Sequence, residues 1–186
     1  MCSIKRAVAL LVLVTFSICV RSDQTKPELD GLFLALKQSA DLIKISTIQN
    51  EIWAHWYELP EESRALQTVF DQGMRALHFG QPKIAIDHFS RVIGAAPQFA
   101  EGWNRRATAY FMVGDFEASL RDIQQTLILE PRHFGALGGL SMILENTRQY
   151  DKAIQAEKLL LELMPENGLI REKIQYLQTQ ALESRI

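Results

Sequence analysis

The apolar residues of this chain recur mostly at intervals of three and four, the period of helices that bury one face. No competing strand pattern is found. The spacing predicts two helices within residues 28–59, one near the end of the chain, and a repeated helix pair between them. The three apolar stripes are Leu29, Leu32, Phe33 and Leu36; Ile45, Ile48, Ile52 and Trp56; and Leu169, Ile170, Ile174, Leu177 and Ala181.

Segment 1–22 has a different pattern, in which a short basic start precedes a run without charge from Ala7 to Val20. A helix of that length is too short to cross a bilayer core of about 30 Å at about 1.5 Å per residue. The pattern is typical of a signal peptide, and we expect residues 1–22 to be removed by cleavage after Ser22, with a cut after Cys19 as the other option. The alternatives are an uncleaved anchor, a buried N-terminal helix, and a lipoprotein modified at Cys19, which Ile18 disfavours.

A sequence repeat organises the middle of the chain. Pro97, Pro131 and Pro165 follow one another at equal intervals. Aligned on these prolines, the three windows keep small residues at positions eight and twenty, where antiparallel helices can approach closely. Each window predicts a helix, a short turn and a second helix, which the proline ends. The small residues are Gly73, Ala107 and Ser141 at position eight, and Ala85, Ser119 and Ala153 at position twenty.

These features resemble the tetratricopeptide repeat, whose pattern has Trp, Leu-Gly, Tyr, Ala, Phe, Ala and Pro at fixed positions. The third window departs from it at Ser141, Leu144 and Glu157. The resemblance implies a right-handed α-solenoid of antiparallel helix hairpins, an architecture that serves many functions. The matching residues are Gly73, Gly80, Ala85, Phe89 and Pro97 in the first window; Trp103, Ala107, Tyr110, Gly114 and Pro131 in the second; and Leu140, Ala153 and Pro165 in the third.

We therefore expect an all-α chain of about nine helices behind the signal peptide. Residues 23–65 are predicted to form an N-terminal helical hairpin or a degenerate repeat. Residues 168–186 are predicted to form a capping helix with a polar outer face, as the end of a solenoid requires. The three repeats between them are residues 66–99, 100–133 and 134–167.

Composition and motifs exclude several classes of protein. The formal charge of −2 becomes −5 without the three basic residues of segment 1–22, which argues against nucleic-acid binding through bulk positive charge. Both cysteines, Cys2 and Cys19, lie in that segment, so the mature chain has no thiol for catalysis. The four histidines lack a metal-ligand spacing, and no catalytic or nucleotide-binding motif is found. We expect no enzyme activity, no metal and no cofactor.

The resemblance places the partner-binding surface on the concave face, which the first helix of each repeat lines. Several residues at these positions are apolar, which suits an extended or helical partner segment with apolar anchors. Methionine adapts well at such surfaces. The candidate residues of this peptide-binding groove are Phe70, Met74, His78, Asn104, Arg105, Thr108, Phe111, Met112 and Met142.

Another interpretation of the groove positions stays open. Phe70, Leu77 and Phe111 are plain packing residues if the N-terminal helices fold into the groove, since large exposed apolar patches are uncommon on monomers. Some members of the family hold the terminal carboxylate of a peptide with paired Lys, Asn and Arg side chains. We expect no such clamp here, because Phe70 and Asn104 stand at the fifth position of the repeat, and Met74 and Thr108 stand at the ninth.

Arg106 is unusual because it stands where this repeat normally has leucine. A guanidinium directed between helices needs a partner, since an unpaired buried charge is costly. We predict a structural ion pair with Asp87 or Asp122. The alternative is that Arg105 or Arg106 contacts the carboxylate of a ligand.

The run from Gly135 to Gly139 is also unusual, because each glycine within a helix costs up to about 1 kcal/mol relative to alanine. Glycine most often marks a close approach of another backbone or side chain. We favour close helix packing as the reason, and a bound chain is the alternative.

The sequence thus predicts an exported, non-enzymatic scaffold or adaptor, periplasmic or secreted in a bacterium, that binds a protein or peptide partner. No nucleic acid is expected, and no membrane span after signal cleavage. Two alternatives remain: a cell-envelope assembly factor held at a membrane by an uncleaved N-terminus, and a regulatory subunit of an enzyme complex.

Overall fold

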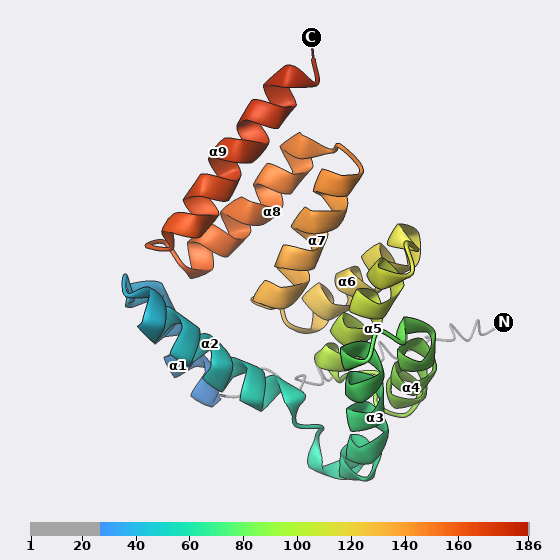
Figure 1. Ribbon diagram of the computed structural model, residues 1–186. Coiled ribbons are helices and arrows are strands. Elements are labelled where there is room, and N and C mark those ends of the chain that lie inside the picture. Colours follow the sequence, from blue (N-terminus) through green and yellow to red (C-terminus); the bar gives the residue numbers. More distant parts are fainter. Residues whose placement is uncertain (1–26, 186) are drawn as a thin grey trace, which may run out of the picture.

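The computed structural model describes residues 27–185, and all regular secondary structure in this range is helical (Figure 1). The predicted signal peptide lies outside the described residues. The predicted all-α helical repeat fold is confirmed. The elements in chain order are α1 (Pro27–Gln38), α2 (Leu42–Tyr57), the short 3₁₀ helix η1 (Glu61–Leu66), α3 (Gln67–His78), α4 (Pro82–Ala95), α5 (Ala100–Met112), α6 (Phe116–Leu129), α7 (Phe134–Asn146), α8 (Tyr150–Leu163) and α9 (Gly168–Glu183).

The helix pairs α3–α4, α5–α6 and α7–α8 stack in an arc, and α9 follows them at its end (Figure 1). Small residues let each pair close. A Cβ atom on Gly73 would lie 2.6 Å from the ring of the buried Phe89, so a larger residue there would displace that ring. In the second pair, Ala107 is buried and its carbonyl accepts a hydrogen bond from Ser119 Oγ at 2.8 Å.

The third pair replaces the usual small apolar contact with a buried polar one. Ser141 Oγ donates a hydrogen bond to Glu157 Oε1 at 2.6 Å, and both side chains are buried. A buried carboxylate is tolerated when its oxygens are hydrogen-bonded. Ser141 and Glu157, two of the departures from the repeat pattern, therefore compensate for each other.

The turn inside each pair requires a left-handed backbone at the fifteenth position of the repeat. Gly80 and Gly114 have φ angles of 66° and 79°, which glycine adopts without steric cost. Arg148 has φ of 57° at the same position of the third pair, where a side chain costs roughly 1–2 kcal/mol.

The hairpin α1–α2 folds back over the solenoid instead of extending it as a further repeat. Its apolar side chains form one core with residues from α7, α8 and the start of α9. We call the side of the solenoid that it covers, bordered by α3, α5 and α7, the inner face. The buried members of this core are Leu29, Phe33, Leu36, Ile45, Ile48, Ile52, Trp56, Phe134, Leu137, Leu160, Met164 and Ile170.

Polar contacts fix the hairpin at the turn between α6 and α7. Arg132 pairs with Asp30 of α1 at 2.7 Å and with the fully buried Glu130 at 3.0 Å. Its guanidinium also lies 4.3 Å from the centroid of the Phe33 ring. These specific contacts make the hairpin an integral part of the fold. Within residues 27–185, no helix combines the length and apolar character that crossing a membrane requires.

Candidate functional site

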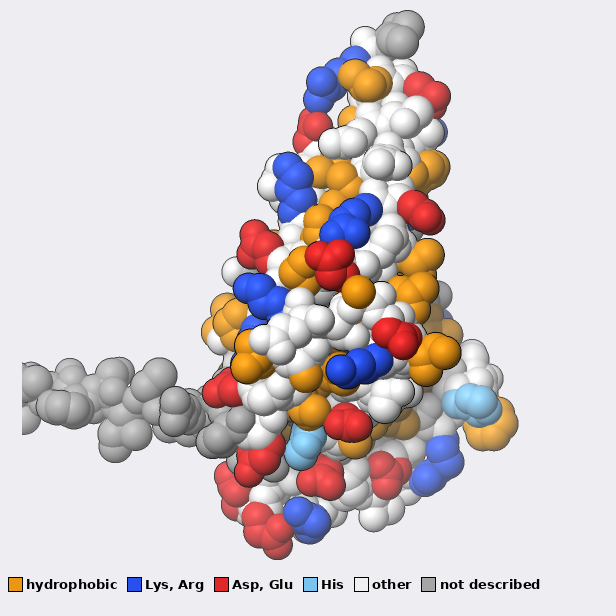
Figure 2. Space-filling model, turned by 90° about the vertical axis from the view of Figure 1, so that its left-hand side faces the viewer, with side chains coloured by type: hydrophobic (Ala, Val, Ile, Leu, Met, Phe, Trp, Pro, Cys, Tyr) orange, Lys and Arg blue, Asp and Glu red, His pale blue; other side chains and the backbone are white. Residues whose placement is uncertain are grey.

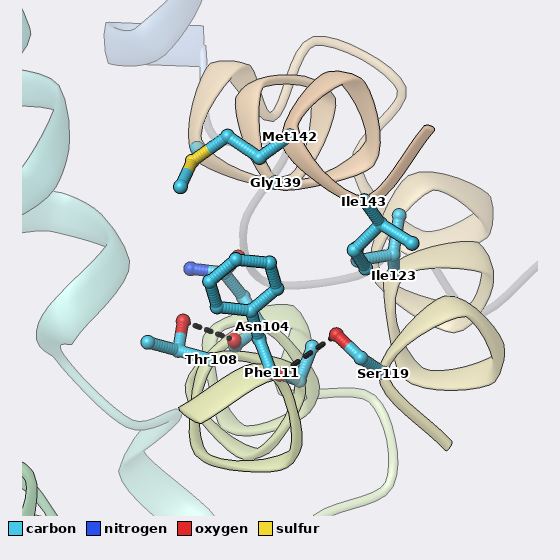
Figure 3. A pocket seen from close by; sticks show the side chains of 10 residues that line it. Asn104, Thr108, Phe111, Ser119, Ile123, Gly139, Met142 and Ile143 are labelled. Atoms are coloured by element: carbon cyan, nitrogen blue, oxygen red, sulfur yellow. Dashed lines mark hydrogen bonds between the residues drawn. The ribbon is translucent and has the colours of Figure 1, made fainter. Parts of the chain in front are cut away.

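An apolar pocket lies on the inner face between α5 and α7, with α6 behind it (Figure 3). Its volume is about 170 Å³. Figure 3 shows Phe111 standing between the two helices, Met142 reaching over from α7, and Ile123 and Ile143 closing one side. None of the lining residues carries a charge. They are Asn104, Ala107, Thr108, Phe111, Ser119, Ile123, Gly135, Gly139, Met142 and Ile143.

The glycine run of α7 has two separate effects. A Cβ on Gly135 would lie 2.5 Å from Trp53 Cη2, so this glycine admits the indole of α2 against α7. Gly139 lines the pocket, and a Cβ there would meet only Ile123 at 3.5 Å. A Cβ on Gly138 would meet nothing within 4 Å. The close packing that we favoured therefore explains Gly135, whereas Gly139 leaves the pocket open.

A buried polar network centred on Glu101 lies beside the pocket. Glu101 and His133 are fully buried, and His133 Nε2 lies 2.9 Å from Glu101 Oε2. Asn104 Nδ2 donates to the same oxygen at 3.0 Å, and Arg105 Nε donates to Oε1. Arg105 also donates to the Tyr57 hydroxyl at 2.6 Å, which ties α5 to the end of α2.

The charges in this network stabilise each other. Burial by itself acts to raise the pKa of the Glu101 carboxyl. The charge of Arg105 and the hydrogen bonds from His133 and Arg105 outweigh burial and hold that pKa below its ordinary value of 4.5. Burial likewise acts to lower the pKa of Arg105, but Glu101 raises it above its ordinary value. Both groups therefore remain charged at neutral pH.

His133 connects this network to the start of α7 and to the hairpin. Its Nδ1 accepts a hydrogen bond from the Ala136 backbone N–H at 3.1 Å and so caps α7. The ring proton therefore lies on Nε2, which donates to Glu101. Trp56 stacks on the imidazole, with ring centroids 4.0 Å apart and planes within 10°.

The ion pair predicted for Arg106 is present, and its partner is Asp122. Arg106 Nε and one terminal nitrogen donate to the two Asp122 oxygens at 2.7 and 2.9 Å, and the other nitrogen donates to Ser90 Oγ at 3.0 Å. Asp87 is exposed. The guanidinium is thus committed to the fold, which removes the alternative of a ligand contact by Arg106.

Three of the predicted groove residues do not present a free surface. Phe70 is only 1% exposed, and its ring packs against Phe89 and Phe99. Asn104 is buried and Arg105 is paired with Glu101, because burying the Glu101 carboxylate requires these donors. Phe70 and Arg105 are therefore corrected to structural residues, and Asn104 lines the pocket while bonded to the network.

Of the other six predicted groove residues, three line the pocket and three do not. Thr108, Phe111 and Met142 line the pocket, and Met142 is 50% exposed. Met112 is 46% exposed at the end of α5. Met74 and His78 lie on α3, away from the pocket lining, with Met74 packed against the core of the first repeat. The structure thus brings four of the nine candidates together, counting Asn104.

The N-terminal helices do fold onto the inner face, but they do not fill all of it. They reach Phe70 through Tyr57, whose ring centroid lies 6.4 Å away. Phe111 instead packs beside Phe116 at 5.5 Å and stays in the pocket lining. The packing interpretation therefore holds for Phe70 and is wrong for Phe111.

Sequence reasoning missed residues from outside the first helices, two that line the pocket and one that contacts its lining. Ser119 and Ile123 come from α6, and Trp53 reaches Gly135 from α2. The close spacing of Trp53, Trp56 and Tyr57 along one helix was the available signal for Trp53. Among residues 27–185, no group of three or more His, Cys, Asp or Glu side chains could hold a metal ion.

Comparison with known proteins identifies the family. The sequence profile of the tetratricopeptide repeat matches residues 106–167. A TPR repeat-containing protein of Rhizobium etli is 34% identical over 156 residues, which are 84% of this chain and 76% of that protein. The chain therefore belongs to the tetratricopeptide repeat family.

Solved structures of the family share the fold at low identity. The first TPR domain of Spaghetti (RPAP3), bound to an HSP90 peptide, is 21% identical with a TM-score of 0.59, and the match covers 65% of this chain and 98% of that domain. The TPR2B domain of yeast Sti1 in its pHsp70 complex is 18% identical with a TM-score of 0.57. This match covers 64% of this chain and 97% of that domain. These likenesses show the fold alone.

Proposed function

We propose that this protein is a non-enzymatic interaction scaffold that binds a protein or peptide segment in the pocket between α5 and α7. The observation that carries the proposal is an uncharged pocket, with exposed Met142 at its edge, between the first helices of consecutive repeats. Binding sites are usually concave, mostly apolar and supplied with a few polar groups, which Asn104 and Thr108 provide here.

The relatives support a peptide as the kind of partner. The Spaghetti structure contains an HSP90 peptide and the Sti1 structure a pHsp70 complex. On the face seen in Figure 2, side chains of both charges are interspersed with apolar ones, which does not favour a polyanionic partner.

Replacing Met142 by lysine is expected to weaken partner recovery about tenfold, because a charge at the pocket edge must be desolvated when a partner binds. Leu159→Lys is the matched control, since Leu159 is 47% exposed on α8 and does not line the pocket. Cross-linking in the native compartment, followed by quantification of the partners, measures the effect. Equal recovery by the two variants would contradict the proposal.

We further propose that residues 1–22 direct export to the periplasm or the exterior of a bacterial cell and are then removed. The basic start and the uncharged run from Ala7 to Val20 support this proposal. N-terminal sequencing of the protein purified from its own cells is expected to begin at Asp23. A product that begins at Met1 and sediments with membranes supports instead the membrane-held alternative.

A further inference from the structure

Trp53 of α2 contacts Gly135, one of the residues that line the pocket, although Trp53 belongs to no repeat and is not itself in the lining. Its six-membered ring lies against Gly135, where Cη2 and Cζ2 are 2.5 and 2.9 Å from the position of a Cβ atom. Gly135 itself lines the pocket. Figure 3 shows the ribbon of α2 facing the pocket on the side opposite Ile123 and Ile143. The indole is only partly buried.

The indole is held in one orientation by its neighbours. It stacks with Tyr57 at a centroid distance of 5.6 Å and an angle of 19°, and it meets Phe134 edge-on at 5.1 Å. The Arg105 guanidinium lies 4.9 Å from its centroid. A side chain fixed in this way loses little conformational entropy when a partner contacts it.

From these contacts we infer that the hairpin supplies a wall of the partner-binding site, with Trp53 as a direct contact. The partner is a chain segment that inserts one uncharged, medium-sized apolar side chain, such as leucine, methionine or phenylalanine, between Trp53, Phe111 and Met142. This inference rests on the proposed function and deepens it by naming both the composite site and the class of segment. Tryptophan is among the residues that most often dominate binding energy at interfaces.

Size and charge select this class of segment. A cavity of about 150 Å³ with an apolar lining accepts a benzene ring, and this pocket has about 170 Å³. None of the lining residues carries a charge, and the Arg105 guanidinium beside Trp53 is already matched by Glu101. The site therefore has no counter-charge to offer a terminal carboxylate, and binding does not require a free C-terminus.

The test uses a library of short peptides with acetylated N-termini, divided into a pool with free C-terminal carboxylates and a pool with amidated C-termini. Selection on the wild-type chain is expected to enrich one apolar residue equally in both pools. NMR spectra of the complex are expected to show nuclear Overhauser contacts between that side chain and the Trp53 indole protons. Contacts to the Met142 methyl group without any to Trp53 overturn the inference.

Trp53→Leu is expected to weaken binding of an enriched peptide about tenfold. Trp103→Leu is the matched control, because Trp103 is also partly buried but contacts the Arg106 guanidinium and the Pro97 carbonyl, which do not line the pocket, whereas Trp53 contacts the lining residue Gly135. Circular dichroism verifies that both variants are folded. Unchanged affinity of Trp53→Leu contradicts the inference and leaves the proposed function standing. Failure of both pools to bind the wild type contradicts the proposed function as well, and enrichment confined to free carboxylates contradicts the named class of segment.

Discussion

Replacing Glu101 by alanine is expected to lower the free energy of unfolding by about 3–5 kcal/mol, the usual effect of removing one partner of a buried ion pair. The substitution leaves Arg105 without its counter-charge and removes the acceptor used by His133 and Asn104. Urea denaturation monitored by circular dichroism measures the loss. A decrease below about 1 kcal/mol contradicts the importance of this network.

Glu117→Ala is the matched control. Glu117 and Arg121 form the same i,i+4 pair one helix later, but their side chains are 86% and 63% exposed. Exposed pairs of this kind contribute less than about 0.5 kcal/mol, because water already solvates both charges. The contrast between the two variants measures the combined effect of burial and of the hydrogen bonds from His133 and Asn104, since residue type, spacing and the arginine partner are the same.

The pH dependence of stability is the second signature of Glu101. Its pKa is lower in the folded chain than the ordinary value of 4.5. The stabilisation that it provides is therefore complete above pH 4.5 and is lost as the pH falls through the folded pKa. The stability difference between the wild type and Glu101→Gln is expected to shrink as the pH falls below 4.5. A difference that grows in acid contradicts the lowered pKa.

Asp122→Ala is expected to lower the free energy of unfolding by about 3 kcal/mol, because it leaves the Arg106 guanidinium without its bidentate partner between α5 and α6. Their side chains are only 17% and 5% exposed, so water cannot replace the lost carboxylate. For a chain of this size the melting temperature is expected to fall by roughly 6–12 °C.

Asp87→Ala is the control for this second prediction, since Asp87 is an exposed aspartate on the preceding second helix. Its melting temperature is expected to stay close to that of the wild type. If both variants melt like the wild type, Arg106 does not depend on Asp122.

The repeat architecture was predictable because its determinants are local and periodic. The equally spaced prolines mark where each helix pair ends, and the small residue at position eight lets the two helices of a pair approach closely. In the first pair, the Phe89 ring fills the space that Gly73 leaves. The partner of Arg106 was predictable as one of two aspartates. Only the helix packing decided that Asp122, and not Asp87, faces it.

The candidate groove was predicted less completely, because position in a repeat does not reveal what covers it. The nine candidates included Phe70, which is buried, and Arg105, which is paired with a buried glutamate. Trp53 could not be assigned to the site by repeat position, since it lies in the hairpin. Its contact with Gly135 joins two residues that lie far apart in the sequence.

The sequence by itself determined the helices and their pairing, because these follow from local spacing and from residue identity at repeated positions, and the family resemblance added the solenoid. Only the tertiary structure decided how much of the inner face stays open. That outcome depends on the balance between the apolar core that docks α1–α2 and the volume left by Gly139 between α5 and α7. Both are contacts between distant segments, which helical periodicity does not encode.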